Sequence, residues 1–113
     1  MKKSLAMVSM LLAGQAFAHH SWSEYDAARP IELTGSIEDA GYVHPHDLGR
    51  LKTADKTWTV ALAQLSRMQN RGLDKAMLVP GERATAYGFQ NRNQPDELRA
   101  ERITIDGKTT ELR

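Results

Sequence analysis

The stretch that decides the fold is IELTGSIED, residues 31–39. Every second residue there is apolar or glycine, and these residues share one face: Ile31, Leu33, Gly35 and Ile37. The residues between them are polar. Such alternation predicts a strand with one buried face and one face in solvent. The glycine in the middle is typical of a bulge or a sharp bend, which allows a long strand to curl around the corner of a barrel.

The residues after this strand predict two more strands and then a helix. A weaker strand is expected at 47–53, and TWTVAL, residues 57–62, is a clear strand with Trp58 in the core. Residues 63–71 change to helical spacing, and Gly72 is placed to end that helix.

The last third of the chain predicts a short turn, two further strands and a closing hairpin. Asp74 is expected to cap the short turn. Strands are then expected at 82–89, at 97–105 and, after the hairpin signal at 106–107, at 109–113. Alternation in the strand 97–105 assigns one common face to Arg99, Glu101, Ile103 and Ile105.

Three strands, one helix and two or three strands follow one another in the order of a small barrel of the OB kind, the oligonucleotide- and oligosaccharide-binding fold. We therefore expect an all-β fold with one helix: an OB-like barrel of five to six strands, with the helix between strands three and four. A plain meander sheet with a packed helix is the competing architecture. The expected division is a signal peptide at 1–18, an extended N-terminal arm at 19–29 and a single small β-barrel domain at 30–113.

The first 18 residues have the pattern of a secretory signal. A positive start at Met1-Lys2-Lys3 precedes the uncharged apolar run 4–14, and Ala16-Phe17-Ala18 supplies small residues for a signal peptidase. The run is shorter than the roughly 20 residues that cross a bilayer, so no membrane span is expected after cleavage. Export to the periplasm is predicted, and an N-terminal anchor or a buried helix is the alternative.

Composition narrows the possible partners of the mature chain. Removing residues 1–18 from the 113 leaves 95, enough for one small domain. Lys2 and Lys3 leave with the signal, so 13 of 15 basic residues remain against 14 acidic ones, a formal charge near −1. Such a domain lacks the basic face that nucleic acids require, and no nucleic acid partner is expected. The absence of cysteine excludes disulfides and thiolate metal sites.

The four histidines fall in two clusters, His19-His20 at the predicted mature terminus and His44-Pro45-His46 between the first two strands. A free N-terminal histidine offers its amine and its imidazole Nδ1 to one ion, and nitrogen donors in a plane suit Cu(II). His44 and His46 are two residues apart in an extended segment, so both imidazoles are expected on one side.

These clusters predict a copper site whose candidate ligands, in order of expectation, are His19, His46, His44, His20 and Asp47. Asp47 is included as an oxygen ligand or as the hydrogen-bond acceptor of a ligating imidazole. In the competing interpretation the histidines bind no metal, and one of the loop pair hydrogen-bonds the backbone at the bend.

No other constellation marks a reaction centre. The arginines alternate with acids and are expected on solvated faces: Arg67, Arg71, Arg83, Arg92, Arg99 and Arg102. Three aromatic residues, Trp22, Tyr25 and Tyr42, are expected either to line a ligand groove or to cover one end of the core. Because no nucleophile motif and no glycine-rich phosphate loop occurs, the protein is expected not to be an enzyme.

The motifs together resemble a family of small exported bacterial proteins of unknown function. Its members have a signal peptide ending in A-H-H-S-F and a later N-P-H step, and this chain has Ala18-His19-His20-Ser21-Trp22 and Pro45-His46. Further matching stretches lie at 25–26, 30–37, 58–60, 70–72, 78–82 and 106–107. Trp22 replaces the family's Phe, and His44 replaces its Asn. The resemblance implies export and a barrel-like fold, and it implies no reaction.

Two functions are therefore expected. The first is a non-enzymatic periplasmic protein that binds a divalent transition metal, copper first, through the mature terminus and the HPH segment. The alternative is an OB-like module that binds a small glycan, a peptide or a protein partner without metal.

Overall fold

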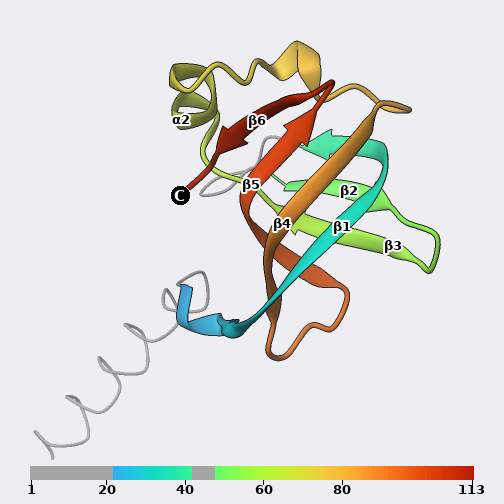
Figure 1. Cartoon of the computed structure of the whole chain (residues 1–113), viewed down its shortest axis with the longest axis vertical. Coiled ribbons are helices and arrows are strands. Elements are labelled where there is room, and N and C mark those ends of the chain that lie inside the picture. The colour runs from blue at the N-terminus through green and yellow to red at the C-terminus, as the bar shows by residue number, and fades with distance from the viewer. Residues whose placement is uncertain (1–21, 42–47) are drawn as a thin grey trace, which may run out of the picture.

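The computed structural model describes residues 22–41 and 48–113, and its elements are drawn in Figure 1. Its six strands are β1 (Tyr25–Gly41), β2 (Leu48–Lys52), β3 (Thr57–Ala61), β4 (Arg83–Asn91), β5 (Glu97–Ile105) and β6 (Lys108–Glu111). The described part of the chain also holds one α-helix, α2 (Leu65–Asn70), and two 3-10 turns, η2 (Trp22–Glu24) and η3 (Lys75–Met77). β1 thus begins inside the segment 19–29 that was predicted as an extended arm.

The six strands form one sheet that closes on itself. Their order is β3-β2-β1-β4-β5-β6, and an additional parallel pairing of β3 with β5 closes five strands into a barrel. β6 pairs with the free edge of β5 as an extra strand, and α2 connects β3 to β4. This confirms the predicted OB-like barrel and excludes the plain meander sheet.

β1 curls around the barrel because it pairs with two neighbouring strands, β4 and β2. Its first part pairs with β4 up to Ser36, and its last part, from Ser36 to Gly41, pairs with β2. Gly35 lies at this changeover, where a Cβ would be only 2.1 Å from the carbonyl oxygen of Lys52. Only glycine permits that approach, which accounts for the predicted bend. A bulge follows at Glu38, where the register with β2 shifts.

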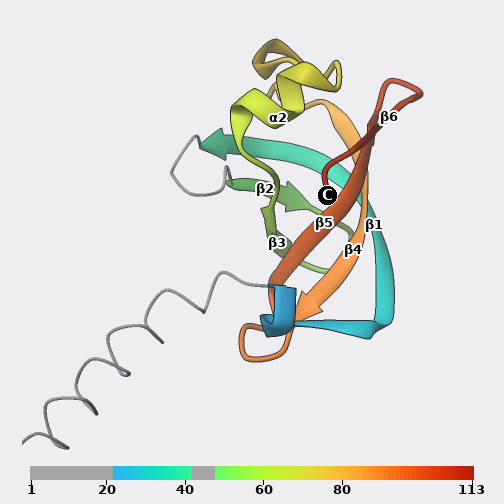
Figure 2. The same cartoon turned by 90° about the vertical axis from the view of Figure 1, so that its left-hand side faces the viewer.

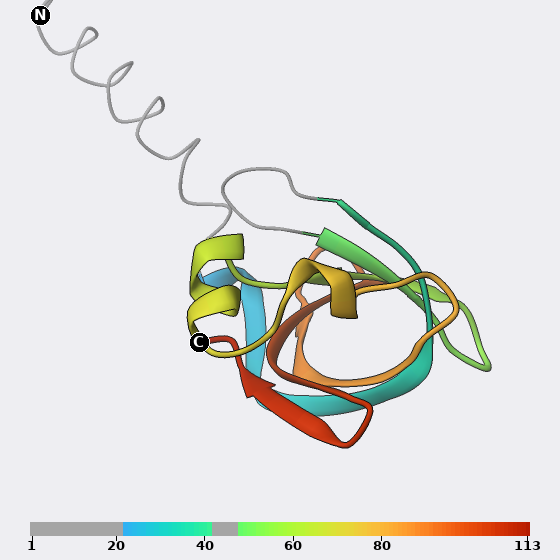
Figure 3. The same ribbon diagram turned by 90° about the horizontal axis from the view of Figure 1, so that it is seen from above.

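The core fills the barrel and extends under the connection between β3 and β4. Trp58, Val60, Leu98 and Ile103 are buried inside, as expected for Trp58. Met68 of α2 is fully buried in the same cluster, and Leu73 and Leu78 join it. Figure 3 looks down the barrel and shows η3 over one end, with α2 beside it.

The turn chemistry after β3 is partly as predicted. Gly72 follows α2 with a φ of 90°, the left-handed conformation that suits the residue after a helix end. Asp74 precedes η3 as expected, but its side chain makes no capping hydrogen bond, so the predicted cap is wrong.

The predicted common face of the strand 97–105 is also wrong. Leu98 and Ala100 are buried in the barrel, as are Ile103 and Ile105, so the inward face changes parity along β5. The register with β4 shifts where Gly88 pairs with Ala100 and Tyr87 pairs with Arg102, which leaves Glu101 as a bulged residue. Arg99 therefore lies outside the barrel, and this orientation builds the site described next.

Within residues 22–41 and 48–113, no helix combines the length and the apolar character that a bilayer crossing requires.

Candidate functional site

A pocket of about 170 Å³ lies on the outside of the barrel. It is lined by Trp22, Leu62, Ala63, Gln64, Arg67, Arg99, Leu112 and Arg113. Figure 2 shows the elements that supply them: α2 above, the chain end after β6 in the middle and η2 below, all beside β5. A second pocket, lined mostly by core residues together with Asp39 and Arg50, measures only about 20 Å³.

Trp22 forms one wall of the pocket and packs on an aromatic cluster. Its ring meets those of Tyr25 and Phe89 edge to face, with centroids 6.3 and 6.0 Å apart. Phe89 is only 7% exposed although it lies outside the main core cluster, because η2 covers it. Of the three aromatic residues expected to line a groove or to cover one end of the core, Trp22 lines this pocket, Tyr25 is buried and Tyr42 lies outside the described residues.

Two guanidinium groups lie against the Trp22 ring. The Arg99 Cζ atom is 4.1 Å from the ring centroid, and the Arg113 Cζ atom is 4.6 Å from it. Cations within about 6 Å of an indole ring are attracted by its electron-rich face. These contacts hold Trp22 over the pocket and orient both arginines.

Tyr25 anchors the segment that carries Trp22. Its hydroxyl donates a hydrogen bond to the Glu97 carboxylate, which also accepts one from the Asn91 amide at 3.1 Å. Burial, followed by the Glu97 contact, raises the pKa of Tyr25 to about 12. The phenol is therefore neutral at any physiological pH and serves as a structural donor.

Arg99 lies in the part of β5 that pairs with β3 and so closes the barrel. Leu48 of β2 pairs with Ala61 of β3, and Ala61 pairs in turn with Arg99 of β5. Burial lowers the pKa of the Arg99 guanidinium, Tyr25 acts in the opposite direction, and the positive charges of Arg113 and Arg67 lower it again. Arg113 and Arg67 thus lie close enough to Arg99 to act on its charge.

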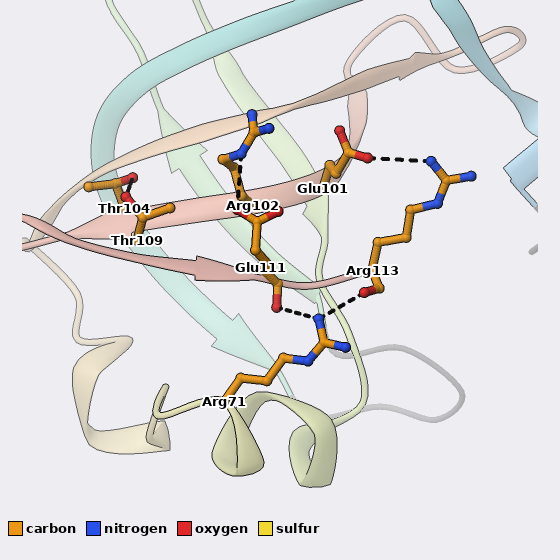
Figure 4. A network of polar contacts seen from close by, with 7 residues as sticks. All are labelled: Arg71, Glu101, Arg102, Thr104, Thr109, Glu111 and Arg113. Atoms are coloured by element: carbon orange, nitrogen blue, oxygen red, sulfur yellow. Dashed lines mark hydrogen bonds and ion pairs between the residues drawn. The ribbon is translucent and has the colours of Figure 1, made fainter.

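The segment after β6 is tied to its neighbours by polar contacts, shown in Figure 4. The Arg71 Nη1 atom donates to the backbone carbonyls of Glu111 and Arg113 at 3.0 and 2.8 Å. The Arg113 side chain pairs with Glu101 at 3.3 Å, and Arg102 pairs with Glu111 at 3.1 Å. These contacts fix Arg113 beside the pocket. The carboxylate that pairs with Arg113 belongs to Glu101, the bulged residue of β5.

Sequence reasoning treated the arginines as solvated, and for Arg99, which is half-buried against Trp22, this is wrong. Arg102 keeps 39% of its side chain exposed, although its Cζ atom lies 4.3 Å from the Tyr87 ring centroid. The predicted exposure is confirmed for Arg67, Arg71, Arg83 and Arg92. The positions of the arginines and acids in the sequence do not reveal that β3 pairs with β5. That pairing brings Arg99, Arg67 and Arg113 to one pocket.

The outer face of β2 and β3, the usual ligand face of an OB barrel, has a different character. Its described side chains are Arg50, Lys52, Thr57 and Thr59, with no aromatic residue among them. Arg50 is already paired with Asp39 at 2.8 Å, and Thr57 donates to Glu38. Stacking of single-stranded bases needs aromatic side chains, so this face does not resemble such a platform.

The predicted copper ligands His19, His20, His44, His46 and Asp47 all lie outside the described residues. Within the described residues, no group of three or more histidine, cysteine, aspartate or glutamate side chains is arranged to hold a metal ion.

Solved structures share this fold at low sequence identity. The crystal structure of TiaS in complex with a tRNA and ATP matches with a TM-score of 0.55 and 18% identity, over 79% of this chain and 20% of that chain. The S. pombe Stn1-Ten1 complex matches with a TM-score of 0.50 and 18% identity, over 68% of this chain and 57% of that chain. This chain thus spans only a fifth to somewhat over half of these structures, and the likeness concerns the fold alone.

No protein with a curated description matches this sequence. A family model does match, over residues 6–98, and its description is "Family of unknown function (DUF6152)".

Proposed function

Because the chain belongs to the family DUF6152, whose function is unknown, we propose its role from the barrel itself: a non-enzymatic, OB-like binding module. The observation that supports this role is the pocket beside Trp22, where aromatic, aliphatic and guanidinium groups meet in one concave site. Small-molecule sites combine apolar walls with a few polar groups in this way. The occupant is a small molecule such as a glycan, a peptide, or an exposed group of a protein partner.

Thermal unfolding with a panel of ligands tests this proposal. The panel contains neutral oligosaccharides, short peptides and small organic anions, each with and without EDTA. A ligand at 100 times its dissociation constant stabilises the folded state by about 2.7 kcal/mol, which raises the midpoint of a domain this small by several degrees. We expect at least one class to raise the midpoint, and EDTA to leave that rise unchanged.

Trp22→Ala should abolish most of the ligand-induced rise, measured against the variant's own unliganded midpoint. Tyr87→Ala is the matched control, since Tyr87 is an aromatic residue outside the pocket lining. The proposal is wrong if no class raises the midpoint, or if Trp22→Ala responds as strongly as Tyr87→Ala.

We also propose export to the periplasm and Cu(II) binding through His19 and His46, with His44, His20 and Asp47 as further candidate ligands. The support is the clustering of all four histidines, together with the chain positions that flank them. Leu48, two residues after His46, pairs with Ala61, which pairs with Arg99. Trp22, two residues after His20, lies against that same Arg99.

Intact-mass measurement of the exported protein, followed by calorimetric titration with Cu(II), tests this second proposal. We expect His19 as the first residue and sub-micromolar binding that His19→Ala/His46→Ala weakens strongly. A chain whose terminal amine is acetylated is the control, because acetylation removes the amine from the amine and imidazole chelate. A different first residue, or micromolar binding that the double variant leaves unchanged, contradicts the proposal.

A further inference from the structure

The pocket lining carries three arginines and no aspartate or glutamate side chain. Arg67, Arg99 and Arg113 come from α2, β5 and the segment after β6. They are separated in sequence by 32 positions (67 to 99) and 14 positions (99 to 113), and closure of the barrel brings them to one cavity. Guanidinium groups pair with carboxylates and phosphates through parallel hydrogen bonds, which makes such a cluster a recognition site for oxyanions.

The protein itself only partly neutralises this charge. Arg113 pairs with Glu101 at 3.3 Å, and its side chain remains 56% exposed. Arg67 is exposed and forms no ion pair with any residue that the structure describes. Glu97, another nearby acid, is held by Tyr25 and Asn91. An incoming anion would therefore meet the positive charge of Arg67 and the exposed side chain of Arg113.

The size and the remaining walls of the pocket limit the ligand. A cavity of about 150 Å³ accepts one benzene-sized molecule, and this one measures about 170 Å³. Leu62, Ala63 and Leu112 supply an apolar side, and the Trp22 ring supplies a flat one. A compact organic group that carries one anionic end fits both the volume and the lining.

We infer that the pocket binds a small organic anion whose carboxylate or phosphate group is held by Arg67, Arg99 and Arg113, with its apolar part against Trp22 and Leu62. This inference rests on the proposed binding function and specifies its ligand class. It does not involve the predicted copper ligands.

Calorimetric titrations with benzoate, benzamide, phenyl phosphate and inorganic phosphate test the inference on the full mature chain. Benzamide has nearly the shape of benzoate without its charge, and inorganic phosphate lacks the apolar part. We expect benzoate or phenyl phosphate to bind with a dissociation constant of about 1 mM or lower at low ionic strength. Benzamide and inorganic phosphate should each bind at least about tenfold more weakly, because each lacks one of the two features.

Arg67→Gln should weaken binding of the anion about fivefold to tenfold, because an exposed charge-assisted hydrogen bond is lost while nothing in the core changes. Arg67→Lys should restore part of it. Arg83→Gln is the control, since Arg83 is equally exposed, lies at the start of β4 and does not line the pocket. Unfolding midpoints of all three variants show that each is folded.

Equal affinity for benzoate and benzamide, or equal losses in Arg67→Gln and Arg83→Gln, overturns the anion inference. In that case a Trp22-dependent response to a neutral member of the ligand panel still supports the proposed binding function. Absence of binding by all four probes overturns the inference as well. The ligand panel of the thermal unfolding experiment then tests the proposed binding function separately.

Discussion

Gly88→Ala is expected to lower the free energy of unfolding by about 3 kcal/mol, the upper part of the range for overpacked cores. Gly88 is buried in β4 and pairs with Ala100 of β5. A Cβ at this position would lie 2.0 Å from the Arg99 carbonyl oxygen and 2.8 Å from the Ala100 Cα. Both atoms belong to the backbone, so the clash can be relieved only if β4 and β5 separate. Urea unfolding followed by circular dichroism measures the loss.

Gly49→Ala is the control for this prediction. Gly49 also lies in a strand, but its nearest obstacle is the Asp39 carbonyl oxygen at 3.4 Å. We expect a change within about 1 kcal/mol, because reduced entropy of the unfolded chain offsets a small adjustment. A Gly88→Ala protein that unfolds at the wild-type midpoint would mean that β4 and β5 do not approach as described.

Leu98→Ala is expected to cost about 3 kcal/mol of stability. Leu98 is fully buried and pairs with Val60 in the parallel β3–β5 contact that closes the barrel. Truncation of a buried leucine removes its transfer free energy and leaves a cavity, at a cost of about 2 to 5 kcal/mol. The same urea titration gives the value, and anion binding in the pocket should weaken if the neighbouring Arg99 shifts.

Leu98→Met keeps nearly the same volume and should cost less than about 1.5 kcal/mol. Small losses in both Leu98→Ala and Leu98→Met would show that the position is not tightly packed. A loss below about 1 kcal/mol in Leu98→Ala would contradict closure of the barrel through β3 and β5.

The element order of the barrel was predictable because its strands carry local signals. Residues 31–39 alternate cleanly, TWTVA is apolar at every second position, and Gly72 ends the helix where its left-handed φ requires glycine. The strand 97–105 was placed at its observed bounds. These features depend on neighbours within a few residues, which a single sequence displays.

The faces of β5 were not predictable for a physical reason. A bulge adds one residue to a strand and reverses the alternation after it, and here the extra residue is Glu101. Its position is imposed by β4, where Gly88 allows β5 to come close. Because that partner lies more than ten positions away in the chain, the pattern of 97–105 alone wrongly grouped Arg99 with Ile103 and Ile105 on one face.

Of the candidate site, sequence reasoning found only Trp22 as a possible groove residue. Arg99 and Arg67 looked like ordinary surface charges, since nothing local shows that Ala61 and Arg99 pair across the closing edge. Arg113 had no signal of its own, because its place beside the pocket depends on Arg71 and Glu101. A convergent charge cluster is a property of the closed barrel and not of any segment.

The most direct test of the arginine pocket is a titration of the uniformly ¹⁵N-labelled protein with benzoate, followed by NMR of the side-chain Nε–H signals. The account predicts saturable shifts of the Arg67, Arg99 and Arg113 Nε–H signals and of the Trp22 indole N–H, all with one dissociation constant. The Arg83 and Trp58 signals should stay in place. Shifts confined to arginines outside the pocket, or none in the Trp22 indole, would contradict the account.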